Sequence, residues 1–216
     1  VCNCGGLEWE EVGGVLYGGD EPDDYSGGRI ERVNLETGAA QVLYDSCDGN
    51  PLKGPNDIVF DNAGGFWFTD YGQSRKRDRD LGGAYYATTD GSSIGEAIYP
   101  LETADGIGLS PDEKTLYVAE TVTQRLFAFD VLNAGVVEVN ERHPLGRLVA
   151  NLPGLKQPDS LAVDSEGIIT MGTLIDGGIT SVSPDGKRME HFSTGDPLTT
   201  NICFGGESLT TAYVTL

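Results

Sequence analysis

The apolar residues of this chain occur in short runs, and clusters of glycine, proline and aspartate separate one run from the next. This pattern is typical of many short strands joined by tight turns, because long helices would show apolar residues at a spacing of 3.6. No stretch approaches the run of about 18 apolar residues that a membrane helix needs. The pattern therefore predicts a soluble, all-β protein.

One strand–turn–strand unit recurs along the chain. Its clearest copies span residues 55–70, 104–120 and 158–173, and weaker copies span 6–20 and 201–215. Aligned apolar positions of the copies lie 51, 49, 54 and 41 residues apart, which is the length of a propeller blade. These aligned positions are Leu7, Ile58, Ile107, Leu161 and Ile202.

Further apolar segments follow each unit and complete a blade. A third strand is expected at 28–33, 83–87, 125–129 and 178–182, and a fourth is expected at positions such as 40–44 and 146–150. Four antiparallel strands per repeat, with the first strand innermost, make a propeller blade. We therefore expect residues 1–216 to form a single β-propeller domain with about four to five blades present.

The blade geometry predicts where polar residues meet. In a four-stranded meander, the start of the first strand and the loop between the second and third strands lie at the same end, near the propeller axis. Asn56, Asp105 and Asp159 each stand two positions before an aligned apolar residue, on the same side of their strands. The loops expected at this end are 20–28, 71–82, 121–124 and 174–178.

Two carboxylates that point at one axis repel each other, and a divalent cation relieves that repulsion. Oxygen ligands from Asp105, Asp159 and Asn56 favour a hard ion, with Ca²⁺ preferred over Mg²⁺ and Mn²⁺. The alternative is a hydrated polar channel without an ion.

Most of the other acidic residues need no functional explanation. Asp112 and Asp185 follow proline in tight turns, where aspartate bonds its own backbone, and Asp61, Asp164 and Asp70 stand at strand ends. The formal net charge of −20 and the isoelectric point near 4.2 argue against nucleic acid and anionic membranes as partners.

Histidine and arginine offer few catalytic options. His143 is expected in a surface loop and His191 on an outer strand, so neither forms a catalytic triad at the axis. Proton transfer would then fall to a carboxylate. Arg75 belongs to a basic cluster, 75–79, on the axial side, where it is either solvated or guides an anionic substrate or product.

The four cysteines do not have the spacing of a zinc or redox motif. Cys2 and Cys4 are expected on one side of a strand, and a link from that pair to Cys47 stays open. No signal peptide is visible at the start of the chain, so we expect a cytoplasmic protein, although the first residue is valine.

Four motifs resemble the SMP-30/gluconolactonase/luciferin-regenerating-enzyme family, and the match covers essentially the whole chain. The motifs are GPNDIVFD at 54–61, DGIGLSPDEKTLYVAE at 105–120, PDSLAVD at 158–164 and NICFGG at 201–206. The resemblance implies a six-bladed propeller with one divalent cation in its channel, Ca²⁺ first and Mg²⁺, Mn²⁺ or Zn²⁺ as options. It also implies hydrolysis of a small lactone such as gluconolactone, by a monomer or homodimer.

The resemblance also assigns roles to individual residues. Asn56 matches an asparagine near the ion and the substrate, and Asp159 matches the ligand aspartate often proposed as base. Asp105 stands where the family has asparagine, which adds a negative charge, and Ser160 replaces the commoner glycine. These assignments give Asp159, Asp105 and Asn56 as metal ligands, Asp159 and Asp105 as catalytic residues, and Asn56 and Ser160 as substrate contacts. The basic cluster adds Arg75 as a further substrate contact.

One expected ligand is missing from the sequence. The family's first-blade Glu-Gly-Pro motif does not occur, and Glu8 lies on the wrong strand face to replace it. At the observed repeat length, 216 residues make fewer than six blades. We therefore expect either that a first blade and a terminal strand are missing from this sequence or that the chain is a shortened variant. Two other functions stay open: hydrolysis of phosphotriesters at the same ion, and a non-catalytic propeller that binds Ca²⁺ or a small ligand.

Overall fold

The computed structural model describes residues 1–139 and 145–216, and these residues form only strands, turns and loops. The all-β prediction is confirmed. His143 lies outside the described residues. Within the part of the chain that is described, no helix is long and apolar enough to cross a membrane.

The strands form antiparallel sheets in chain order. Three of the sheets are meanders of the expected kind, and the middle one carries an additional short strand, β17 (Val136–Val137). Their strands are β8 (Pro55–Phe60), β9 (Gly65–Asp70), β12 (Gly82–Thr88) and β13 (Ile94–Leu101); β14 (Ala104–Leu109), β15 (Thr115–Glu120), β16 (Arg125–Asn133) and β18 (Arg147–Asn151); and β19 (Lys156–Val163), β20 (Ile169–Ile175), β21 (Gly178–Val182) and β22 (Met189–Ser193).

Partial sheets flank these three meanders. The first sheet has the order β1-β4-β5, and β23 pairs with β24 at the other end of the chain. Three small hairpins complete the described strands. The bounds are β1 (Cys2–Asn3), β4 (Arg29–Val33) and β5 (Ala40–Tyr44); β23 (Asn201–Gly205) and β24 (Thr211–Thr215); β2 (Trp9–Val12) and β3 (Val15–Gly18); β6 (Ser46–Cys47) and β7 (Asn50–Pro51); and β10 (Ser74–Arg75) and β11 (Asp78–Arg79).

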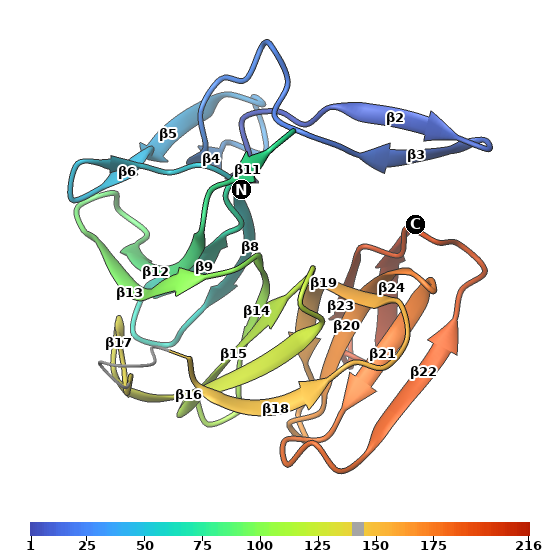
Figure 1. Cartoon of the computed structure of the whole chain (residues 1–216). Helices are drawn as coiled ribbons and strands as arrows, with labels where there is room; N and C mark the ends of the chain where they lie inside the picture. The colour runs from blue at the N-terminus through green and yellow to red at the C-terminus, as the bar shows by residue number, and fades with distance from the viewer. Residues whose placement is uncertain (140–144) are drawn as a thin grey trace.

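The sheets stand side by side in an open arc, with the first strand of each complete meander on the inside (Figure 1). Strand β14 lies between β8 and β19, and β19 in turn contacts β23. This radial order is the arrangement of propeller blades, in which every inner strand brings one end to a common axis.

The hydrophobic cores lie between neighbouring sheets. Trp67 on β9 and Phe127 on β16 belong to one cluster, Leu126 and Met171 belong to a second, and Phe68 packs in a third beside the N-terminal sheet. Burying a side chain of this size stabilises the fold by about 1.5–3 kcal/mol. Since each cluster joins two sheets, packing fixes how the inner strands face one another.

The segment around Leu7 is not an inner strand, and that prediction is wrong. Strands β2 and β3 follow β1 and precede β4 in the chain, and they form a separate hairpin. Its residues Trp9 and Leu16 are 63% and 53% exposed. The alternating pattern of this hairpin resembles that of an inner strand, but among the described residues its two strands pair only with each other. Instead, β1 lies innermost in the first sheet.

The cysteines are all free thiols. Cys2 lies on β1 and Cys4 lies just beyond that strand, so the two do not share a strand as expected. Cys47 is buried, and no link to it forms.

Candidate functional site

A bulge at the start of three inner strands sets the geometry of the candidate site. Between the paired positions Pro55↔Asp70 and Ile58↔Phe68, strand β8 carries two residues where β9 carries one. Strands β14 and β19 have the same irregularity. The first residues of the three bulges are Asn56, Asp105 and Asp159, so the equivalence expected from the sequence is present.

Close approach of the inner strands brings two of these side chains together. A Cβ atom at Gly106 would lie 2.5 Å from the carbonyl oxygen of Asp159, so only glycine lets β14 run this close to β19. The side chains of Asp105 and Asp159 are close enough for each carboxyl to influence the pKa of the other.

The Asp105 carboxyl group is almost completely buried, at 3% exposure. Its Oδ2 accepts a hydrogen bond of 2.8 Å from the hydroxyl of Thr121, whereas its Oδ1 is buried without a hydrogen-bond partner. Burial raises the pKa of Asp105 well above its ordinary value, and the charge of Asp159 raises it further. Burial also raises the pKa of Asp159. Asp105 is buried and Asp159 is half-buried, and two carboxyls held this close bind either a proton or a cation.

The second residue of the first bulge, Asp57, is a buried carboxyl that the sequence reasoning missed. Its Oδ2 accepts the backbone N–H groups of Ile107 at 3.0 Å and Leu161 at 3.2 Å, and its Oδ1 accepts that of Ile58 at 2.9 Å. One carboxyl group thus joins β8, β14 and β19. Burial raises the pKa of Asp57 to about 6.

Two threonines, one at the end of a second strand and one just after another, complete this polar layer, and both were missed as well. Thr121 follows β15 and donates to Asp105. Thr69 on β9 accepts the backbone N–H of Asp57 at 3.1 Å and donates its hydroxyl to the backbone carbonyl of Asp105. The only sequence signal for them is their place at the axial end of an apolar strand.

Asn56 and Ser160 occupy different environments. Asn56 is exposed, so its amide is open to a ligand. Ser160 is 5% exposed and its Oγ lies 3.5 Å from Oδ1 of Asp159. Its backbone N–H donates to the same carboxyl oxygen at 2.8 Å. Ser160 therefore faces the carboxyl pair and helps to orient Asp159.

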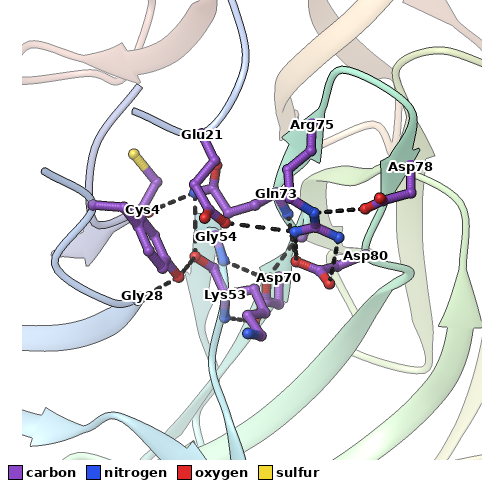
Figure 2. A network of polar contacts seen from close by, with 12 residues as sticks. Cys4, Glu21, Gly28, Lys53, Gly54, Asp70, Gln73, Arg75, Asp78 and Asp80 are labelled. Atoms are coloured by element: carbon purple, nitrogen blue, oxygen red, sulfur yellow. Dashed lines mark hydrogen bonds and ion pairs between the residues drawn. The ribbon is translucent and has the colours of Figure 1, made fainter. Parts of the chain in front are cut away.

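Arg75 lies on the β10–β11 hairpin, apart from the carboxyl pair, and it is engaged by three acidic side chains. Its guanidinium contacts Asp78 at 2.6 Å, Asp80 at 3.0 Å and Glu21 at 3.5 Å (Figure 2). These contacts tie the hairpin to the loop that follows β3. Since its charge is already shared among three carboxylates, Arg75 has little left for a substrate.

The loops on this side are held together by further polar contacts (Figure 2). Asp70 accepts the backbone N–H groups of Lys53, Gly54 and Gly72 at 2.6–2.9 Å. Gln73 donates to the carbonyl oxygen of Cys4 at 2.8 Å. The structural role expected for Asp70 at a strand end is thus confirmed. Its carboxyl group holds the loops on this side of the sheets and not a turn at their other end.

The acidic residues assigned to turns and the described histidine are also as predicted. Asp112 accepts the hydroxyl of Ser110, and Asp185 accepts that of Ser183. His191 lies on the outermost strand of its sheet, β22, with its Nδ1 2.9 Å from the hydroxyl of Thr180.

The residues at the bulges fit a divalent cation. Asp105 and Asp159 provide two carboxylates, and Asn56 stands at the equivalent position with an amide oxygen. The unpartnered Oδ1 of Asp105 is a buried oxygen atom with no hydrogen bond to satisfy it, which is a cost that a cation would remove. Oxygen donors of this kind suit Ca²⁺ or Mg²⁺. Among the described residues, no group of three or more histidine, cysteine or acidic side chains could hold a metal, so any cation here must use asparagine, backbone or water oxygens as well.

A family profile and several curated proteins are similar to this chain. The SMP-30/Gluconolactonase/LRE-like region profile matches residues 25–216. Lactonase drp35 of Staphylococcus saprophyticus is 42% identical over 116 residues, which cover 51% of this chain and 33% of that protein. Lactonase drp35 of Staphylococcus aureus is 39% identical over 113 residues, with the same coverage of both chains.

Two solved structures are similar over most of the chain. A gluconolactonase from Xanthomonas campestris superposes with a TM-score of 0.71 at 26% identity, and it covers 87% of this chain and 62% of its own length. Regucalcin from Agrobacterium tumefaciens, described as a calcium-binding protein, gives a TM-score of 0.72 at 19% identity over 88% of this chain and 61% of its own. The chain spans about one third of the curated relatives and less than two thirds of the solved structures.

Proposed function

Because this chain belongs to the SMP-30/Gluconolactonase/LRE-like family, we propose that it is part of a six-bladed propeller that hydrolyses lactones at a divalent cation. The single observation that carries the proposal is the buried Asp105, with its unpartnered Oδ1, beside the half-buried Asp159 at the axial end of the inner strands. Relatives named lactonase and gluconolactonase support the reaction.

Asp105, Asp159 and Asn56 would hold the cation, and Ca²⁺ is our first choice because all three donate oxygen. A cation bound there supplies Lewis-acid polarisation of the ester carbonyl. The buried setting strengthens this effect, because water is kept away from the charges.

The chain's own groups then divide the remaining work. Asp159, with Asp105 as the alternative, accepts a proton from the attacking water, and Ser160 holds the Asp159 carboxyl in place. Thr121 keeps Asp105 oriented through its hydroxyl. Asn56, which is exposed, orients the substrate. The water oxygen adds to the carbonyl carbon, the ring C–O bond breaks, and the released alkoxide is protonated to give a hydroxycarboxylate.

The experiment is a hydrolysis assay of the full-length protein with a panel of sugar and aliphatic lactones. The protein is first treated with a chelator and then supplied with Ca²⁺, Mg²⁺, Mn²⁺ or Zn²⁺. We expect ring opening that is lost with the chelator and restored by at least one cation. Absence of ring opening under every condition would refute the proposal, and turnover of a phosphotriester alone would favour that other reaction.

A further inference from the structure

The three bulges at the axial ends of the inner strands share one hydrogen-bond acceptor. Each bulge is closed by an apolar residue at which regular pairing resumes: Ile58 on β8, Ile107 on β14 and Leu161 on β19. The backbone N–H groups of these residues all donate to the carboxyl group of Asp57, at 2.9, 3.0 and 3.2 Å respectively. Equivalent positions of three sheets therefore converge on a single side chain.

Only one of the three strands supplies this carboxyl group. The second bulge residue is Asp57 on β8, whereas the corresponding residues of β14 and β19 are Gly106 and Ser160. A Cβ atom at Gly106 would lie 2.5 Å from the carbonyl oxygen of Asp159, so this position has no room for a second acidic side chain. Loss of the Asp57 carboxyl would therefore release β14 and β19 at the same time.

A hydroxyl group on β9 holds the backbone of Asp57 against β14. Oγ1 of Thr69 accepts the backbone N–H of Asp57 at 3.1 Å and donates to the backbone carbonyl of Asp105. Thr69 is fully buried and Asp57 is 9% exposed, so water does not readily replace these bonds. Both the backbone and the side chain of Asp57 are thus bonded to the segment that carries Asp105.

The N–H groups that Asp57 accepts lie close to the candidate cation ligands along the chain. Each donor stands two positions after a ligand, in the order Asn56, Asp105 and Asp159. Two residues span at most about 7 Å, so a fixed N–H group limits how far the ligand before it can move. The spacing between the ligands therefore depends on the bonds to Asp57.

We propose that Asp57 is a positioning residue that sets the spacing of Asn56, Asp105 and Asp159, and with it the affinity of the candidate site for a divalent cation. Residues that orient metal ligands without contacting the metal commonly control affinity in this way. The inference rests on the cation site of the proposed function and adds the residue that determines how tightly this site binds.

The test measures the affinity of the full-length, chelator-treated protein for Ca²⁺ by calorimetry. Asp57→Ala removes the shared acceptor and should raise the Kd for Ca²⁺ by about tenfold or more, which is the usual cost of losing a residue of this kind. Asp57→Asn removes the charge but keeps one oxygen for the N–H groups of Ile107 and Leu161. It should therefore raise the Kd by a clearly smaller factor than Asp57→Ala does.

Two further variants control for stability and for failure to fold. Val182→Ala opens a cavity in the core at the last residue of β21, at the turn end of its sheet, so it destabilises the fold without touching the bulges. It should leave the Kd unchanged. Thr69→Val frees the backbone of Asp57 and keeps its carboxyl group, and it should raise the Kd. This variant carries the test if thermal unfolding shows that Asp57→Ala does not fold.

The outcomes separate this inference from the proposed function. Equal losses of affinity in Asp57→Asn and Asp57→Ala would show that charge, and not positioning, is what the cation needs from Asp57. A wild-type Kd in Asp57→Ala, or in Thr69→Val if the alanine variant is unfolded, would show that Asp57 supports the fold alone. Each of these results would overturn the inference. A wild type that binds Ca²⁺ but opens no lactone would refute the hydrolysis alone, whereas one that binds no divalent cation would overturn both proposals.

Discussion

Aspartates stand at both ends of the inner strands, and the two ends treat the same carboxyl group in opposite ways. At the turn end, Asp112 accepts a hydroxyl and a backbone N–H in full contact with water, and the bond from Ser110 lowers its pKa. At the axial end, burial raises the pKa of Asp105 and Asp159.

The difference teaches where function can reside. A turn aspartate stabilises local structure, because its charge is solvated and its hydrogen bonds are made with its own loop. A pair of like charges that is largely removed from water does not stabilise the fold by itself, and it is costly unless a proton or a cation joins it. Perturbed carboxyls of this kind cluster at functional sites. We therefore expect substitutions of aspartates at the axial end to change catalytic activity, and substitutions at the turn end to leave it unchanged.

The largest expected effect comes from exchanging one carboxyl at each end. Asp159→Asn should reduce kcat/KM for the best lactone by about a thousandfold, since it removes the proposed base and one cation ligand. Asp112→Asn, the matched change at the turn end, should stay within about twofold. Thermal unfolding of both variants shows that each is folded. Full turnover by Asp159→Asn would mean that the axial pair does no chemistry.

A second substitution separates structural from chemical carboxyls within the axial end itself. Asp57→Ala leaves the buried N–H groups of Ile107 and Leu161 without an acceptor, at about 1–3 kcal/mol each. We expect urea unfolding to show a loss of about 3 kcal/mol in the free energy of unfolding.

The control for Asp57 is Asp164, which also accepts two backbone N–H groups through one oxygen, from Glu166 and Ile168, both at 2.9 Å. Asp164 stands at a turn, where water can replace the lost acceptor, so Asp164→Ala should cost about 1 kcal/mol or less. Equal losses from the two alanine variants would show that burial does not distinguish these carboxyls.

The fold was largely predictable from the sequence because strands and turns leave local signals. Alternating apolar residues and Gly or Asp turns predicted the inner strands β8, β14, β19 and β23 with their partners, and the shared register of Asn56, Asp105 and Asp159. They did not predict β13 or the short strands β10, β11 and β17. The same signals misled at Leu7, since an exposed hairpin can alternate just as an inner strand does, and only contact with a neighbouring sheet separates the two.

The site was less predictable because its details depend on contacts between sheets. Asp57 follows Asn56 directly, and nothing local says that the second bulge residue turns inward to bond β14 and β19. The prediction for Arg75 had the same limit. It stands in a basic run, and only the contacts of the folded hairpin show that acidic side chains hold its guanidinium.

The smallest expected effect is the pH dependence of one turn aspartate and one aspartate at the axial end. NMR titration of labelled carboxyls should give Asp185 a pKa below the ordinary 3.8, because the hydroxyl of Ser183 donates to its charged form, and Asp70 a pKa above 3.8, because burial disfavours its charge. The two carboxyl groups change the free energy of unfolding with opposite signs. Asp185 stabilises the folded state at pH values above its unfolded pKa, and this stabilisation is lost as the pH falls through its folded pKa. Asp70 takes up its proton more readily in the folded state, so it raises the free energy of unfolding as the pH falls. The stability gap between the wild type and Asp185→Asn should therefore shrink below about pH 4. If both carboxyls titrated on the same side of 3.8, the two ends of the strands would not differ in the way proposed.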